Sequence, residues 1–128
     1  NAELAKAHGF ETYGRPVEGN LWDSENLDNA IIGIHDYFGF LKYGFTRAQV
    51  VASFDIRRGR RSREQAILEV REIDPYPEAY LGVPLDYILT QIGLTRRLFD
   101  AIADSFANRS LLERVSPGHW KLREEHAL

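Results

Sequence analysis

The chain has 128 residues, of which 44% are hydrophobic and 27% are charged, and its formal net charge is −3. These values fit one globular domain and exclude a disordered chain, and no apolar run reaches the roughly 20 residues that a membrane span requires. Cysteine and methionine are both absent. We therefore expect no disulfides and no thiolate metal site, a cytoplasmic location, and a chain that is a piece of a longer protein.

The N-terminal segment, residues 3–22, is a poor helix candidate after its first turn. Helix-breaking residues interrupt it at Gly9, Gly14, Pro16 and Gly19. We expect an irregular entry segment that is anchored to the rest of the domain by Phe10, Tyr13 and Trp22.

The next segment, residues 27–41, predicts the central helix. Its apolar residues recur at steps of four and three: Leu27, Ile31, Ile34, Phe38 and Leu41. This spacing is that of one helix face. Ile32, Tyr37 and Phe40 make the other side apolar too, so we expect the most buried helix here, ended by Gly44.

Four further helices are predicted, each from a start signal and a stop signal. Thr46 opens one that ends near Gly59, and Ser62 opens the next in a capping box with Gln65. Pro84 and Thr95 open the last two, of which the first ends at Gly93 and the second near Asn108. Beyond Asn108 the signal weakens, and Pro117-Gly118 predicts a turn.

These elements predict an all-α fold, a compact bundle of about five helices with an irregular N-terminal segment. No strand pattern is evident, and the short connections favour antiparallel neighbours. Four phenylalanines lie on the predicted apolar stripes and are expected in the core: Phe38, Phe54, Phe99 and Phe106.

The strongest local feature is a run of five arginines within seven residues: Arg57, Arg58, Arg60, Arg61 and Arg63. We call residues 57–63 the arginine turn. Guanidinium groups bind phosphate and carboxylate at two points, and the start of the following helix adds an anion site. The alternative is a solvated basic turn in which some arginines pair with Asp55, Glu64 or Glu69.

His35-Asp36 lies within the predicted central helix. A histidine beside a carboxylate can act in acid–base chemistry. Adjacent helix residues point about 100° apart, however, so we expect no ready dyad and interpret His35 as a core histidine. The spacing of the four histidines and of the carboxylates predicts no metal site, and no phosphate-binding loop is present.

An ordered set of short segments resembles a known family. The segments are 35–37 (His-Asp-Tyr), 40–48 (Phe-Leu-Lys-Tyr-Gly-Phe-Thr-Arg-Ala), 53–59 (Ser-Phe-Asp-Ile-Arg-Arg-Gly) and 63–66 (Arg-Glu-Gln-Ala). They are similar to the C-terminal region of the N-acetyl sugar amidotransferases, pyrophosphatase-loop enzymes of lipopolysaccharide and surface-polysaccharide biosynthesis. The resemblance covers about residues 22–108. It implies that residues 1–128 are a single helical domain, the C-terminal part of a longer enzyme.

The resemblance also implies a reaction of the C–N ligase type. ATP adenylates the acetamido oxygen of a nucleotide-linked sugar, and ammonia from a glutaminase, passed through an ammonia-channel subunit, displaces AMP to leave an acetamidino group. The family's ATP loop is absent here, so ATP and magnesium are expected in the full-length enzyme and no cofactor in this chain, which alone would not be catalytic.

The substrate's diphosphate suits the basic residues of the matching segments. The expected substrate-binding residues are His35, Lys42, Arg47, Asp55, Arg57 and Arg63, with Asp55 orienting one of these three arginines or meeting a sugar hydroxyl. The catalytic residues stay unassigned. A salt-bridge network around the helix turns is the structural alternative.

Two other functions remain open. A helical protein-binding or nucleic-acid-binding module could use the Arg57–Arg63 turn. The negative net charge and the lack of exposed aromatics between the arginines argue against nucleic acid. A docking surface for the glutaminase is compatible with the first reading, and no membrane association is expected.

Overall fold

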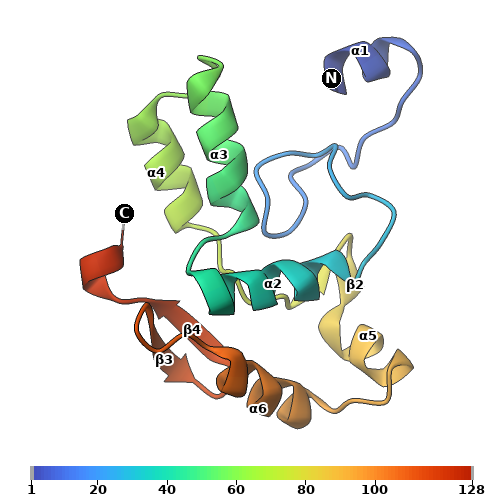
Figure 1. Ribbon diagram of the computed structural model, residues 1–128. Helices are drawn as coiled ribbons and strands as arrows, with labels where there is room; N and C mark the ends of the chain where they lie inside the picture. The colour runs from blue at the N-terminus through green and yellow to red at the C-terminus, as the bar shows by residue number, and fades with distance from the viewer. Residues whose placement is uncertain (1, 128) are drawn as a thin grey trace.

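The computed structural model describes residues 2–127, and its helices surround the central helix α2 (Figure 1). In chain order the α-helices are α1 (Ala2–Ala7), α2 (Ile32–Tyr43), α3 (Arg47–Arg57), α4 (Arg63–Arg71), α5 (Leu85–Gln91) and α6 (Arg96–Phe106). The strands are β1 (Ala79–Tyr80), β2 (Val83–Pro84), β3 (Leu112–Ser116) and β4 (His119–Leu122), and a 3₁₀ turn, η1, spans Glu124–His126.

The prediction of an all-α fold is wrong, because two antiparallel two-stranded sheets accompany the helices. The β1–β2 hairpin turns through Leu81 and Gly82, both at positive φ, as a two-residue turn of primed type requires. In the β3–β4 hairpin, Leu112 pairs with Leu122, and the register shifts near the turn at Pro117-Gly118. The molecule is therefore of mixed α and β structure.

Helix α2 begins at Ile32, five residues later than the sequence predicts. Asn26 has positive φ, and the side chain of Asn29 accepts a hydrogen bond from the backbone N–H of Ile31. These asparagine turns compete with helix formation. The helix ends as predicted, at Gly44 in the left-handed conformation, whose N–H donates to the carbonyl of Phe40.

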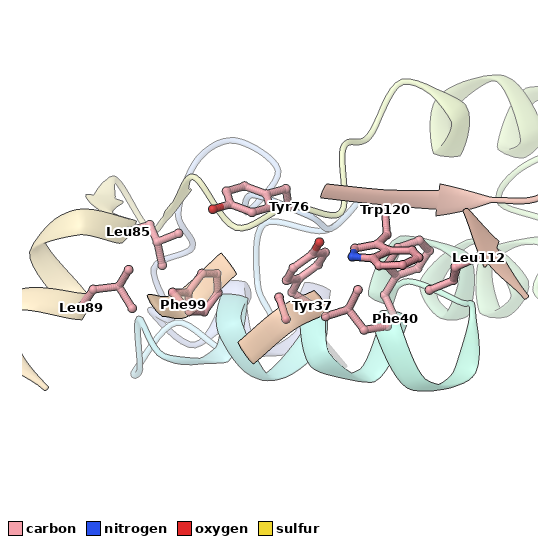
Figure 2. Packing of buried hydrophobic residues seen from close by; sticks show 10 residues of the cluster. Tyr37, Phe40, Tyr76, Leu85, Leu89, Phe99, Leu112 and Trp120 are labelled. Atoms are coloured by element: carbon pink, nitrogen blue, oxygen red, sulfur yellow. The ribbon is translucent and has the colours of Figure 1, made fainter. Parts of the chain in front are cut away.

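The core lies on the face of α2 that carries Tyr37, Phe40 and Leu41 (Figure 2). The C-terminal hairpin adds Leu112 and Trp120 to this cluster. Further members come from α5, α6 and the segment before β1: Tyr76, Leu85, Leu89, Phe99 and Ala103. The buried face thus differs from the predicted stripe, because Ile31 is exposed and Ile34 and Phe38 are only partly buried.

Helices α3 and α4 pack against each other as a helical hairpin on the opposite side of α2 from α6 (Figure 1). The hairpin buries small residues, Ala48, Ala52 and Ala66, and contributes none to the main core cluster. Phe54 on α3 and Phe106 on α6 are exposed, so their predicted place in the core is wrong.

The N-terminal segment is irregular after α1, as predicted, and runs beside α3 (Figure 1). Two of the expected anchors differ in their contacts. Trp22 donates a hydrogen bond to Asp55 on α3, whereas Phe10 is exposed. The carboxylate of Glu18 accepts hydrogen bonds from the backbone N–H groups of Leu81 and Gly82, at 2.8 and 3.1 Å. The segment is thereby tied to the β1–β2 turn. No helix within residues 2–127 is long and apolar enough to cross a membrane.

Candidate anion-binding site at the arginine turn

The arginine turn joins α3 to α4, and local sequence signals shape it. Gly59 follows the end of α3 at a φ of 67°, a conformation that glycine adopts without steric cost. Ser62 then begins α4, and its Oγ accepts a hydrogen bond from the N–H of Gln65 at 3.1 Å. The side chain of Gln65 donates to Glu69 instead of returning to Ser62, so only half of the predicted capping box forms.

Arg61 is held inward by two carboxylates. Its guanidinium forms a short ion pair with Asp55, and its Nε donates to Glu69 at 2.6 Å. Hydrogen bonds from Gln65 and Arg61 lower the pKa of Glu69. Asp55 is almost fully buried and also accepts a hydrogen bond from the indole N–H of Trp22 at 3.0 Å. Asp55 therefore pairs with Arg61, which is not one of the arginines expected to bind substrate. This contact is the one that the alternative of a salt-bridged turn expects.

The other four arginines of the turn stay exposed: Arg57, Arg58, Arg60 and Arg63. The guanidinium groups of Arg57 and Arg58 lie 5.0 and 5.9 Å from the centre of the Phe54 ring. Arg60 reaches only to 4.0 Å from Asp55. Only Arg61 among these five arginines forms close ion pairs. The positive charge of the other four is therefore presented to solvent.

Arg63 is the first residue of α4 and lies beside a groove between α3 and α4. The groove has a volume of about 180 Å³, and Ala52, Ile56 and Val70 are among its apolar lining residues. This position puts the Arg63 side chain at the N-terminal end of α4, where the helix dipole also favours an anion.

Arg47, another predicted substrate-binding residue, lies at the other end of α3. Arg47 and Arg57 are ten residues apart on this helix, which is about 15 Å and longer than a diphosphate group. Asp36 holds Arg47 at 2.8 and 3.1 Å, and Glu25 lies 3.6 Å from it. Hydrogen bonding to Asp36 raises the pKa of Arg47. The structure therefore does not bring Arg47 and Arg57 to one point.

His35 and Lys42 also lie outside the arginine turn, on α2. The side chain of His35 is 72% exposed, so its interpretation as a core histidine is wrong. Its Nδ1 approaches Asp36 Oδ1 to 3.2 Å, which contradicts the expectation that neighbouring helix residues stay apart. Lys42 is exposed, with its ammonium 5.2 Å from the centre of the Tyr43 ring.

Sequence reasoning named Glu69 among the carboxylates that could pair with the arginine turn, but it did not connect Trp22 with the turn. Trp22 lies 33 residues before Asp55, and no local pattern relates the two. Glu69 lies eight residues after Arg61, about two helical turns, and the sequence named it only as one of several available carboxylates.

Comparison with known families shows which family the chain belongs to. A family model described as LPS biosynthesis protein WbpG-like, C-terminal domain, matches residues 8–125. The chain belongs to this family. A search of the curated proteins found no match. The WbpG-like assignment confirms the resemblance drawn from the sequence and places the chain in lipopolysaccharide biosynthesis. In this WbpG-like domain, the match includes α2, α3, α4 and the arginine turn.

Proposed function

We propose that this WbpG-like domain is the substrate-binding and assembly part of an ATP-dependent N-acetyl sugar amidotransferase. In this proposal the arginine turn binds the diphosphate of a nucleotide-linked sugar, with Arg57 and Arg63 as direct ligands. The observation that carries it is the exposure of four arginines around Gly59, in a domain whose family acts in lipopolysaccharide biosynthesis. Arginine forks match phosphate oxygens at two points.

Electrostatics supports a diphosphate at this turn. The exposed guanidinium groups repel one another, and only Arg61 has carboxylates close enough to offset its charge fully. The amide groups at the start of α4 add partial positive charge at the same place. A bound diphosphate would lower the repulsion, whereas the neutral sugar would not.

The positions of Arg47, Lys42 and His35 restrict the proposal. Arg47 is engaged by Asp36 and Glu25 beside α2, so we assign it to the support of α3 rather than to the diphosphate. Lys42 and His35 remain predicted substrate contacts only if the sugar reaches the exposed side of α2. Asp55 acts by holding Arg61 and Trp22 in place.

The chemistry itself would occur on another part of the enzyme, because this chain has no ATP-binding loop. The acetamido oxygen attacks the α-phosphorus of ATP, and pyrophosphate leaves. Ammonia, supplied by a glutaminase through a channel subunit, adds to the imidate carbon. AMP then leaves with the former acetamido oxygen, and loss of a proton gives the acetamidino group. The domain would hold the nucleotide end of the substrate in the cytoplasm during these steps.

The test uses the full-length natural protein with ATP, Mg²⁺, an ammonium salt and a UDP-linked N-acetyl sugar. Mass spectrometry is expected to detect replacement of the acetamido oxygen by NH, together with one AMP per product. The 128-residue chain alone is expected to release neither AMP nor ADP from ATP. If the full-length protein forms no amidine with any nucleotide-linked N-acetyl sugar, the proposed function is wrong.

The arginine turn is tested in the same assay. Arg63→Ala is expected to raise the KM for the nucleotide-linked sugar about tenfold, because one charge-assisted contact is lost, and to leave the KM for ATP unchanged. Arg97→Ala, an exposed arginine on α6, is the matched control. An unchanged KM in Arg63→Ala would contradict the assignment of this residue.

A further inference from the structure

A cleft of about 800 Å³ opens beside the arginine turn, between α1, the irregular N-terminal segment and the C-terminal end of α3. Its volume lies in the range of small-molecule sites. The residues that carry the argument are Phe10, Trp22, Phe54, Arg58 and Arg60, all of which line it. None of them belongs to the substrate-binding set expected from the sequence.

Three aromatic side chains line this cleft: Phe10, Trp22 and Phe54. Phe10 and Phe54 are 45% and 40% exposed, so ring surface faces solvent at the lining. Trp22 is partly buried, and its orientation is fixed by the hydrogen bond from its Nε1 to Asp55. Because stacking on exposed rings is favourable for any planar heterocycle, this lining suits a nucleobase.

Two carboxylates that line the cleft, Asp23 and Glu25, already have partners within the protein. Asp23 accepts a hydrogen bond from Thr12 at 2.8 Å and lies 3.6 Å from Lys6. Glu25 accepts a hydrogen bond from Asn20 at 3.0 Å.

Glu25 also pairs with Arg47, so these two carboxylates are engaged within the protein. Glu3, on α1, has no cation beside it among the described residues and would repel a phosphate. Arg58 and Arg60 are exposed and belong to the arginine turn, so the anionic part of a ligand is expected at the α3 side of the cleft.

We propose that the α1–α3 cleft binds the nucleoside diphosphate portion of the substrate. The base would lie against Phe10, Trp22 and Phe54, and Arg58 and Arg60 would be further ligands of the diphosphate beside Arg57 and Arg63. The inference rests on the proposed function and extends it, because it places the base next to the arginine turn. A diphosphate alone would need no aromatic surface. A nucleoside alone would need no arginines. The cleft offers both within one bounded space.

The test measures tryptophan fluorescence of the 128-residue chain. The sequence contains two tryptophans, and Trp120 belongs to the core; in a Trp120→Phe background the signal therefore reports Trp22 alone. The probes are UDP and GDP, with inorganic pyrophosphate and the free nucleosides as half-ligands. Saturable quenching by a nucleoside diphosphate is expected, with at least tenfold weaker binding of either half-ligand.

The variants separate the two parts of the site. Arg58→Ala/Arg60→Ala is expected to weaken nucleoside diphosphate binding at least tenfold, because two of the phosphate ligands are lost. Phe54→Leu is expected to weaken it about fivefold or more, since stacking contributes roughly 1–3 kcal/mol per base. Arg97→Ala and Phe106→Leu are the matched controls, an exposed arginine and an exposed phenylalanine on α6. Thermal unfolding of each variant checks that it folds.

Three results would overturn the inference. One is the absence of saturable quenching with UDP, GDP or pyrophosphate. A second is equal affinity for pyrophosphate and for nucleoside diphosphates, which would indicate an anion site without a base. A third is tighter binding of a single-stranded oligonucleotide than of any mononucleotide, which would favour a nucleic-acid-binding module.

The inference and the proposed function can fail separately. If the full-length enzyme makes the amidine but Phe54→Leu leaves its KM unchanged, the inference alone is wrong. If nucleoside diphosphates bind in the cleft but no amidine forms, the proposed function alone is wrong.

Discussion

Gly118 is the glycine at which the fold leaves least room for a side chain. Its φ is 76°, and it lies in the turn between β3 and β4. A Cβ atom at this position would overlap the carboxyl group and the Cβ of Asp100. Asp100 cannot move freely, because its Oδ1 accepts a hydrogen bond from Tyr76 at 2.6 Å. The turn is therefore specified by both conformation and space.

We predict that Gly118→Ala lowers the free energy of unfolding by roughly 2–3 kcal/mol, the sum of backbone strain and overpacking. Gly93→Ala is the control, because Gly93 also has positive φ but open space around its Cα, and it should lose only about 1 kcal/mol. Urea unfolding compares the two. Equal losses in both variants would show that the Asp100 contact has no effect.

Asp104 connects α6 to the C-terminal hairpin. It accepts hydrogen bonds from Arg114 at 2.7 Å, from the indole N–H of Trp120 at 2.9 Å and from the N–H of Gly118 at 3.0 Å. Burial opposes ionisation of this carboxyl, but the three hydrogen bonds outweigh it and lower its pKa. The ionised form is therefore favoured more strongly in the folded chain than in the unfolded chain.

This lowered pKa predicts how stability depends on pH. The stabilisation is complete above the unfolded pKa of about 3.9 and is lost as pH falls through the lower folded value. The difference in unfolding free energy between wild type and Asp104→Asn should thus be largest near pH 7 and shrink below about pH 4. Urea unfolding across this range measures it, with Asp86→Asn as an exposed control. A difference that stays constant with pH would contradict the prediction.

At the scale of elements, side-chain caps define where the helices begin. Thr46 Oγ1 accepts a hydrogen bond from the N–H of Gln49 at 3.3 Å, and the N–H of Thr46 donates to Gln49 Oε1 at 2.6 Å. We predict that Thr46→Ala costs about 1 kcal/mol of unfolding free energy because it removes half of this box. Thr46→Ser, which keeps the hydroxyl, should cost much less in the same measurement. If Ser and Ala are equally destabilising, the hydrogen bond is not the cause.

The sequence was most informative about these helices and least about the strands. Thr46, Ser62 and Thr95 cap helices as predicted, since a cap is a local interaction. β1 and β2 have two residues each, and β3 and β4 have five and four, too few for a period of two to stand out. The β3–β4 hairpin is held by tertiary packing of Leu112 and Trp120, which no local pattern reports.

One part of the candidate site could be predicted from the sequence and another part could not. The concentration of arginines at the turn could be predicted because it is local. Which arginine is neutralised could not, because Asp55 is oriented by Trp22, far away in the chain. The α1–α3 cleft could not be predicted from the sequence either, because it depends on how the irregular N-terminal segment runs beside α3.

At the scale of the whole molecule, the C-terminal hairpin completes the core. Leu112 and Trp120 pack with Tyr37, Phe40 and Leu41, and Tyr37 Oη donates a hydrogen bond to the carbonyl of Gly118 (Figure 2). The N–H of Asn108 donates to the carbonyl of Leu41 at 2.8 Å. The hairpin is therefore part of the hydrophobic centre rather than an appendage.

We predict that removal of residues 109–128 abolishes cooperative unfolding, because the apolar face of α2 would lose its cover. Removal of residues 124–128 alone should be tolerated, since residues 124–127, the described part of this segment, contribute nothing to the core cluster. Calorimetry of both truncated chains distinguishes the cases. A sharp unfolding transition in the 1–108 chain would show that the hairpin is dispensable.

The contact between Tyr37 and Gly118 joins residues 81 positions apart, and this separation has a consequence for synthesis on the ribosome. The contacts between α3 and α4 are local and can form as soon as residue 71 has emerged. The core cannot close until Trp120 has left the exit tunnel, so the growing chain carries the apolar face of α2 uncovered while residues 44–120 emerge. Closing such a long loop is also slow. The helical hairpin that carries the arginine turn can thus form before the main core closes.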